Sequence, residues 1–403
     1  MADPADRTPV DPPRSGRWIL ALVGLAILTA AGLMLEVASE RQVDLAEGRA
    51  AQIIPPRNDV GFLIDGARDM VDQRPYTGSD HNIEYPAVTS AQYLPFALLP
   101  AGLDYPLTLT LSAAVILATL RMWGGTMALR KHWLYALMLA PPVVSLIRLD
   151  QLNAAIGLAL LTLAGIAQRR NRPWLLGITV ALSLSRPTNA VPVLVALLIT
   201  TGFRRPRLLA ATILIPTAWL GVLSLVAYRW DPNWIQHTMA AAPLRGLAGL
   251  PAFIREVYGA TAVTLMIPLS GVVAGLIAWH ARGKGMSEDL LAGLLAMSVV
   301  TSQLGGAYVG VFALPAVIRV ARNASNSNWI WAPVLLYSGL VLVAEILAAW
   351  APGTPGVTAV GLLSICAPLG LAAVAVLLLR PKTPPSVPSP NAPNVRATSL
   401  RHG

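Results

Sequence analysis

Uncharged apolar runs recur along almost the whole 403-residue chain. A run of about 20 apolar residues is long enough to cross the hydrocarbon core of a bilayer as an α-helix. Eight runs are clearly separated from one another, at residues 18–35, 106–120, 132–147, 152–168, 208–228, 257–279, 329–344 and 357–379. The pattern predicts an all-α polytopic membrane protein.

The composition excludes other classes of protein. Hydrophobic residues make up 55% of the chain and charged residues only 12%, whereas a soluble domain has about 25% charged residues. A soluble enzyme, a disordered chain and a fibrous protein are therefore excluded. The single cysteine, Cys366, lies in an apolar run, so we expect neither disulfides nor a cysteine metal cluster. Walker, dinucleotide-binding and His-Glu-x-x-His motifs are missing from the sequence, and we predict no cofactor and no metal site.

Two further uncharged stretches each allow two interpretations. Residues 173–203 are interrupted by Ser185-Arg186-Pro187, and residues 290–318 contain Gly305-Gly306. Each stretch is either one long span or two short helices that meet at an outer tip.

The basic residues favour the two-helix interpretation. If both stretches are hairpins, the chain crosses the membrane about twelve times with both termini inside, and twenty of the thirty Lys and Arg residues lie on inner segments. A single span at 173–203 would instead place Arg204, Arg205 and Arg207 outside, against the positive-inside rule. We therefore assign the net charge of +10 to membrane orientation and expect no nucleic-acid partner.

The tails complete the predicted domain organisation. Residues 1–17 are polar and basic and form a cytoplasmic tail, residues 18–380 form the transmembrane domain, and residues 381–403, rich in Pro, Ser and Asn, form a disordered cytoplasmic tail. A signal peptide is the alternative for residues 18–35. That run is long for such a segment, and no small-residue cleavage site follows it directly, so we predict an uncleaved anchor.

Two outer loops follow from this topology, at residues 36–105 and 229–256. The first holds eleven of the twenty acidic residues, and its aromatic and aliphatic residues predict an ordered lid. The second is rich in aromatic residues, which are typical of segments in the headgroup layer.

The order of short motifs between residues 50 and 205 resembles a known family. The motifs are Asn58-Asp59-Val60-Gly61-Phe62-Leu63-Ile64-Asp65-Gly66-Ala67-Arg68, Arg74-Pro75-Tyr76, Tyr85-Pro86 and Leu94-Pro95-Phe96-Ala97-Leu98-Leu99-Pro100-Ala101. They resemble glycosyltransferase family 87, which contains polyprenyl-phosphate-mannose-dependent α-1,2-mannosyltransferases of actinobacteria with the GT-C fold.

Two later motifs extend the resemblance. Pro141-Pro142 followed by Asp150-Gln151-Leu152-Asn153 is similar to the family's Pro…Gly-Gln-x-Asn stretch, with Asp150 in place of Gly, and Ser185-Arg186-Pro187 is similar to its Lys/Arg-Pro step. The chain departs from the family at Phe62-Leu63, where tyrosines are common, and after Tyr85, where two prolines are frequent.

The resemblance implies a GT-C type bundle with a long first outer loop. It also implies an inverting membrane glycosyltransferase. Such an enzyme transfers mannose, another hexose or a pentose from a polyprenyl phosphate to a glycolipid or lipid-linked glycan. The reaction takes place on the outer face of a bacterial plasma membrane, without a nucleotide-sugar site. The alternatives are a transporter or flippase for a lipid-linked or anionic substrate, whose sites also use broken helices, and a non-catalytic assembly partner.

The acceptor hydroxyl in such a reaction needs a general base. By resemblance, Asp59 in the first outer loop is the match; the alternative is that Asp59 caps a helix. Asp65 and Asp69 are expected on a solvated helix face.

The leaving phosphate needs positive charge or oriented donors. Arg186 is the only charged residue between residues 173 and 203, and charged residues at membrane depth usually face a cavity or a partner. The alternative for Arg186 is an interfacial anchor whose side chain reaches the membrane surface. Arg57 and His237 are weaker candidates for the phosphate, and His237 is otherwise an ordinary polar loop residue.

Four residues are candidates for binding the sugar or the acceptor: Tyr85, Asp150, Gln151 and Asn153. The last three lie between two spans on the outer side, and their alternative role is to cap the start of a helix.

Overall fold

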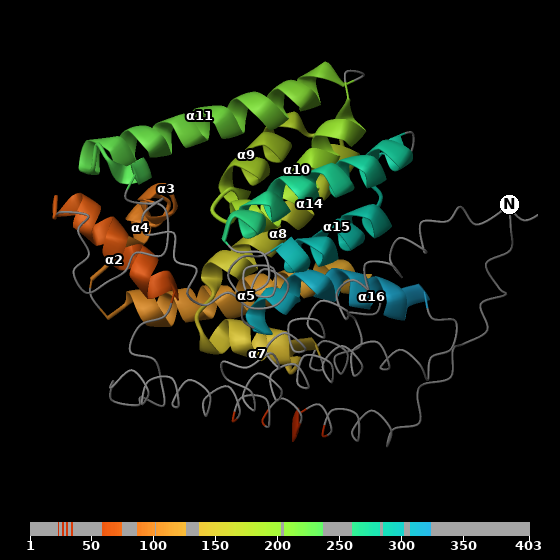
Figure 1. Ribbon diagram of the computed structural model, residues 1–403. Coiled ribbons are helices and arrows are strands. Elements are labelled where there is room, and N and C mark those ends of the chain that lie inside the picture. Colours follow the sequence, from red (N-terminus) through yellow and green to blue (C-terminus); the bar gives the residue numbers. More distant parts are fainter. Residues whose placement is uncertain are drawn as a thin grey trace, which may run out of the picture.

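The computed structural model describes residues 59–74, 87–100, 102–125, 137–202, 205–236, 260–282, 285–301 and 307–323, together with residues 23, 26, 27, 30 and 34. Within these residues all regular secondary structure is helical, as predicted (Figure 1). The helices are α2 (Asp59–Val71), α3 (Ala87–Ala91), α4 (Leu94–Ala97), α5 (Asp104–Gly124), α7 (Pro141–Arg148), α8 (Leu152–Arg169), α9 (Pro173–Ser183), α10 (Pro187–Thr201), α11 (Pro206–Trp230), α14 (Ala260–Ala281), α15 (Glu288–Thr301), η3 (Ala307–Ala313) and α16 (Leu314–Asn323).

Three of these helices, α5, α8 and α11, are long and apolar enough to cross a membrane, judged by length and composition. They coincide with the predicted runs 106–120, 152–168 and 208–228. The runs 329–344 and 357–379 lie outside the described residues, as do most of 18–35 and the first part of 132–147. The described part therefore establishes an all-helical bundle with three candidate spans, and the expectation of about twelve crossings stays a prediction.

Proline sets where several helices begin. It is the first residue of α7, α9, α10 and α11, a position where its fixed φ suits the helix and its missing N–H costs nothing. The predicted break in 173–203 follows from this chemistry, because α9 ends at Ser183 and α10 begins at Pro187. The stretch 290–318 is also divided, into α15 and the pair η3 and α16.

Hydrogen bonds define the two ends of the bundle. At one end, Arg186 donates from Nη2 to Oε1 of Gln151 at 2.9 Å, and these residues directly precede α10 and α8. At the other end, Gln168 of α8 donates to the Thr200 and Thr201 hydroxyls of α10 at 2.8 and 2.7 Å. Helices α8 and α10 therefore run in the same direction, and α9, which connects them in the chain, runs in the opposite direction.

Helix α15 runs in the opposite direction. Its first residue, Glu288, pairs with Arg319 of α16 at 2.9 Å and lies 3.8 Å from Arg169 at the end of α8. Near its other end, the carbonyl of Ser298 accepts a hydrogen bond of 3.1 Å from Asn189, three residues after Arg186. We call the two ends of the bundle the Arg186 end and the Glu288 end.

Charge separates the two ends. The helix termini at the Glu288 end carry basic residues, namely Arg121, Arg169, Arg170, Arg172, Arg205, Arg207, Arg282 and Arg319. Glu288 and Asp289 lie among them and pair with Arg169 and Arg319. The acidic residues Asp65, Asp69, Asp72, Asp104 and Asp231 belong to the opposite end, together with Arg68 and Arg74. Basic residues thus outnumber acidic ones among the described residues of the Glu288 end, and the assignment of that end to one side of a membrane stays a prediction.

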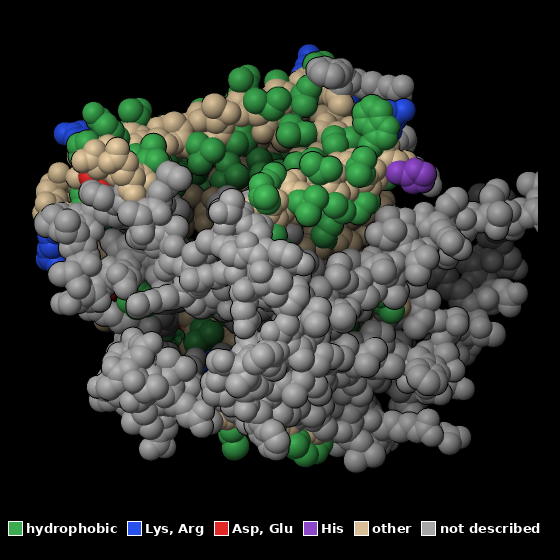
Figure 2. Space-filling model, viewed as in Figure 1, with side chains coloured by type: hydrophobic (Ala, Val, Ile, Leu, Met, Phe, Trp, Pro, Cys, Tyr) green, Lys and Arg blue, Asp and Glu red, His purple; other side chains and the backbone are tan. Residues whose placement is uncertain are grey.

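Helices α11 and α14 present exposed apolar faces (Figure 2). Leu214 and Leu225 of α11 are 65% and 69% exposed, and Leu265 and Leu276 of α14 are 62% and 67% exposed. Large apolar side chains in such continuous rows are unusual on a soluble monomer and suit contact with lipid.

The short helices α2, α3 and α4 form a lid beside the Arg186 end (Figure 1). Val60 and Leu63 of α2 and Tyr93, just before α4, are buried in one cluster with Leu152, the first residue of α8. The segment that the sequence predicts to be a lid is thus helical and packed against the bundle at α2–α4.

Candidate functional site

Arg186 occupies a buried position at the junction of α9 and α10. The residue is only 5% exposed. Its guanidinium donates to Gln151 and lies 5.3 Å from the centroid of the Tyr308 ring in η3. This burial does not fit an interfacial anchor, whose charged head would reach the membrane surface. The hydrogen bond and the cation–π contact instead hold the guanidinium in a defined orientation inside the bundle.

The depth of Arg186 follows from the length of α9. This helix has 11 residues, which corresponds to about 16 Å at 1.5 Å per residue. The hydrocarbon core of a bilayer is about 30 Å thick. If the Glu288 end lies at one membrane surface, Arg186 therefore lies well below the opposite surface.

Asp150 has an unusual backbone conformation, and its side chain is held by two hydrogen bonds. Its φ of +48° lies in the left-handed region, which glycine adopts without strain and which Asp tolerates better than most residues. Its carboxylate oxygens accept hydrogen bonds from Thr108 at 2.5 Å and Ser112 at 3.3 Å, both on α5.

Gln151 and Asn153 do not cap α8. Gln151 stands at the N-cap position but makes no capping hydrogen bond with its side chain, which accepts from Arg186 instead. Asn153 is 1% exposed, and neither its amide nitrogen nor its amide oxygen has a hydrogen-bond partner among the described residues. A buried polar group left in this state costs about 1–3 kcal/mol.

Tyr93 connects the lid to these buried groups. Burial raises the pKa of its phenol far above the usual range, while the charge of Arg186 lowers that pKa and the charge of Asp150 raises it. Tyr93 packs in the same buried cluster as Leu152, the residue that follows Gln151. The sequence did not single out Tyr93, because it is one of several aromatic residues in the first loop and no motif distinguishes it.

Asp59 is the first residue of α2. Its neighbour Val60 packs in the cluster that contains Leu152, so the backbone of Asp59 starts close to the beginning of α8. A position at the start of a helix also agrees with the capping alternative. The side chain of Asp59 lies outside the described residues, and so do Arg57, Tyr85 and His237.

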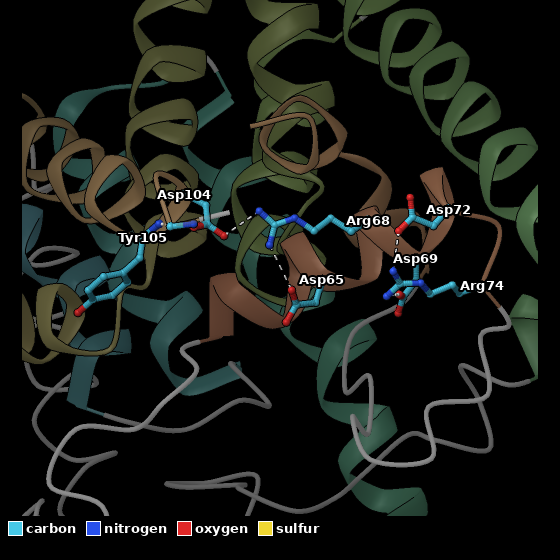
Figure 3. Close-up of polar contacts among 8 residues, drawn as sticks. Asp65, Arg68, Asp69, Asp72, Arg74, Asp104 and Tyr105 are labelled. Carbon is cyan, nitrogen blue, oxygen red and sulfur yellow. Dashed lines mark hydrogen bonds and ion pairs between the residues drawn. The ribbon is translucent and has the colours of Figure 1, made fainter. Parts of the chain in front are cut away.

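Ion pairs order the remaining carboxylates of the lid (Figure 3). Arg68 bridges Asp65 at 3.4 Å and Asp104, the first residue of α5, at 3.0 Å. Arg74 pairs with Asp72 at 2.9 Å and lies 3.6 Å from Asp69. Asp65 and Asp69 are thus half-buried partners of arginines, which is a more structured role than the solvated face that the sequence suggested.

The lid also contacts the end of α11. The indole nitrogen of Trp230 donates to the carbonyl of Arg74 at 2.6 Å. Together with the Arg68–Asp104 pair, this bond joins α2 to two of the candidate spans. The lid is therefore fixed to the bundle through both polar and apolar contacts.

The described residues contain no group of three or more His, Cys, Asp and Glu side chains that could hold a metal ion. Comparison with protein-family models, curated proteins and solved structures finds no match to this chain.

Proposed function

We propose that this protein is an integral-membrane glycosyltransferase of the GT-C type, which transfers a sugar, most simply mannose, from a polyprenyl phosphate to a glycolipid or lipid-linked glycan. The observation that carries the proposal is the buried, oriented guanidinium of Arg186 beneath an acidic and aromatic lid. A planar guanidinium offers paired donors that match phosphate oxygens. A water-poor site strengthens that interaction.

The reaction needs only groups that this end of the bundle supplies. The acceptor hydroxyl oxygen attacks the anomeric carbon of the sugar, and the bond from that carbon to the phosphate oxygen breaks. The polyprenyl phosphate leaves as an anion on Arg186 and needs no protonation by a strong acid. We assign the hydroxyl proton to Asp59, whose helix packs on the first residue of α8.

Membrane orientation follows from the charge separation between the two ends. Basic residues gather at the Glu288 end, and we propose that this end faces the cytoplasm. The lid and Arg186 then face the outer side of the plasma membrane, where a polyprenyl-linked donor and a glycolipid acceptor meet.

A transporter is the second candidate, and one feature favours it. The break between α9 and α10 and the start of η3 meet at the Arg186–Tyr308 contact, and transporters bind substrates where interrupted helices meet. A transporter would move a lipid-linked or anionic substrate across the membrane without forming a new glycosidic bond.

Product analysis separates the two candidates. Proteoliposomes containing the purified protein are supplied with radiolabelled polyprenyl-phosphate mannose and a bacterial glycolipid extract. The proposal predicts label in a new glycolipid, together with release of unlabelled polyprenyl phosphate. Movement of intact labelled lipid between leaflets without a new product would favour the transporter.

A further inference from the structure

The amide of Asn153 is a buried polar group that the protein itself leaves unused. It is 1% exposed, and neither the amide nitrogen nor the amide oxygen finds a hydrogen-bond partner among the described residues. Buried side-chain polar atoms in native proteins are nearly always hydrogen-bonded, and each exception needs an explanation. A bound ligand is one explanation that can be tested.

The neighbours of Asn153 already have other roles. The carboxylate of Asp150 accepts hydrogen bonds from Thr108 and Ser112. The amide oxygen of Gln151 accepts from Arg186. Of the three polar residues at the start of α8, Asn153 is therefore the one whose hydrogen-bonding capacity remains available to a ligand.

The position of Asn153 on α8 places it on the face turned toward η3. Residues four apart lie on one face of an α-helix, so Asn153 shares a face with Gly157. A Cβ at Gly157 would lie 3.6 Å from Cζ of Phe312 in η3. Tyr308 belongs to the same 3₁₀-helix and lies against the guanidinium of Arg186. Asn153 therefore lies on the face of α8 that is turned toward η3, the helix that also contacts Arg186.

The chemistry of an amide matches a hydroxyl group. The side chain of Asn153 offers two N–H donors and one acceptor oxygen, and a hydroxyl both donates and accepts. In a sugar phosphate, hydroxyls lie directly beside the phosphate. An amide that faces the same helix as a phosphate-binding guanidinium is therefore suited to recognise the two groups together.

We propose that Asn153 binds a hydroxyl of the sugar carried by the lipid phosphate, and that this contact makes the site select the sugar-bearing lipid over the bare lipid phosphate. This inference rests on the proposed function and assigns the selection to one residue. After transfer, the contact with the sugar is lost, so the product lipid is held less tightly than the donor.

Binding measurements on two lipids test the inference. The full-length protein in detergent is titrated with polyprenyl-phosphate mannose and, separately, with the same polyprenyl phosphate without sugar. The wild-type protein is expected to bind the sugar-bearing lipid about tenfold more tightly, the worth of one or two good hydrogen bonds. Asn153→Leu is expected to bind both lipids alike, whereas Arg186→Ala is expected to weaken both.

Thermal unfolding of a matched pair of variants separates a binding role from a structural one. Gln168 is the buried amide at the other end of α8, and its nitrogen donates to Thr200 and Thr201. Gln168→Leu should lower Tm and leave the preference between the lipids unchanged. Asn153→Leu should keep or raise Tm while the preference disappears, because no hydrogen bond within the described part of the protein is lost.

The experiments distinguish failure of the Asn153 assignment from failure of the proposed function. If the wild-type protein prefers the sugar-bearing lipid and Asn153→Leu keeps that preference, the assignment to Asn153 is wrong while the proposed function stands. If the wild-type protein binds neither lipid, the proposed function fails and the inference fails with it. A fall in Tm of Asn153→Leu as large as that of Gln168→Leu would show that Asn153 has a structural role.

Discussion

Arg186 and Gln151 are 35 positions apart in the sequence and are joined by a buried hydrogen bond of 2.9 Å. The bond connects the residue that precedes α8 to the residue that precedes α10. It brings together two candidate motifs that are separate in the sequence, the Asp150–Asn153 stretch and the Ser185-Arg186-Pro187 break. The proposed site is built on this contact.

Asp150 should be sensitive to the loss of its side chain. Asp150→Ala removes the acceptor for Thr108 and Ser112 and places a residue poorly suited to positive φ at +48°. We expect a loss of about 3 kcal/mol in the free energy of unfolding, measured by thermal or denaturant unfolding in detergent. Asp150→Asn, which tolerates this backbone conformation and keeps an acceptor oxygen, is the control and should lose much less. Equal losses would contradict the proposed role of the side chain.

Gly177 allows α9 to approach α11 closely. A Cβ at this position would lie 2.4 Å from Cδ1 of Ile215 and 2.8 Å from the carbonyl oxygen of Ala211. Because the backbone must shift, Gly177→Ala should destabilise the protein by about 1–3 kcal/mol.

Gly221 in α11 is the matched control. No atom lies within 4 Å of a Cβ added there, so Gly221→Ala should raise stability by up to about 1 kcal/mol through its better helix propensity. Unfolding curves for the two variants that shift in the same direction would show that α9 and α11 do not pack as described.

Much of the helical framework is predictable from the sequence for physical reasons. Apolar runs must be helical in a bilayer because every backbone polar group needs an internal partner, and α5, α8 and α11 follow three of those runs closely. Pro187 and Pro206 fix helix starts by local chemistry, so the break beside Arg186 is also visible in the sequence.

The pairing of side chains in the site is less predictable. The contacts of Tyr93 and Tyr308 with this region depend on how the lid and η3 pack, which no local pattern encodes. The same holds for Asp65 and Asp69, whose arginine partners are set by the shape of the lid. Asn153 stands beside Gln151 in one motif, yet only the three-dimensional structure shows that one amide is engaged and the other is not.

The role of Asp59 can be tested by removing its charge. General-base assistance is worth about 10²–10⁴-fold in rate, whereas a helix cap contributes about 0.5–2 kcal/mol to stability and nothing directly to the chemical step. Asp59→Asn keeps most of the capping capacity but loses the proton acceptor. It should therefore reduce sugar transfer by at least about 100-fold while donor binding persists.

Asp65→Asn is the control for Asp59. Asp65 lies on the same helix and pairs with Arg68, so its amide variant should keep near-normal transfer. A dead Asp65→Asn protein with an active Asp59→Asn protein would mean that the base is the other carboxylate.

Membrane orientation is testable with single cysteines after Cys366→Ala. Gln236 follows α11 on the lid side, and Arg170 follows α8 at the Glu288 end; both are exposed. In intact cells, an impermeant thiol reagent should label Gln236→Cys and leave Arg170→Cys unlabelled until the membrane is opened. Labelling of Arg170→Cys in intact cells would reverse the proposed orientation.

Transfer of labelled sugar by Arg186→Ala, with Arg282→Ala as the matched variant, tests whether Arg186 holds the leaving phosphate. Both arginines contact an aromatic ring, Arg186 with Tyr308 at 5.3 Å and Arg282 with Trp279 at 3.9 Å, but Arg282 lies at the Glu288 end. We predict that Arg186→Ala reduces transfer by at least about 100-fold. Arg186→Lys should recover part of this activity, because lysine restores the positive charge but lacks the paired N–H donors of the planar guanidinium. Arg282→Ala should transfer sugar like the wild type. Wild-type transfer by a correctly folded Arg186→Ala protein would show that Arg186 does not hold the leaving phosphate.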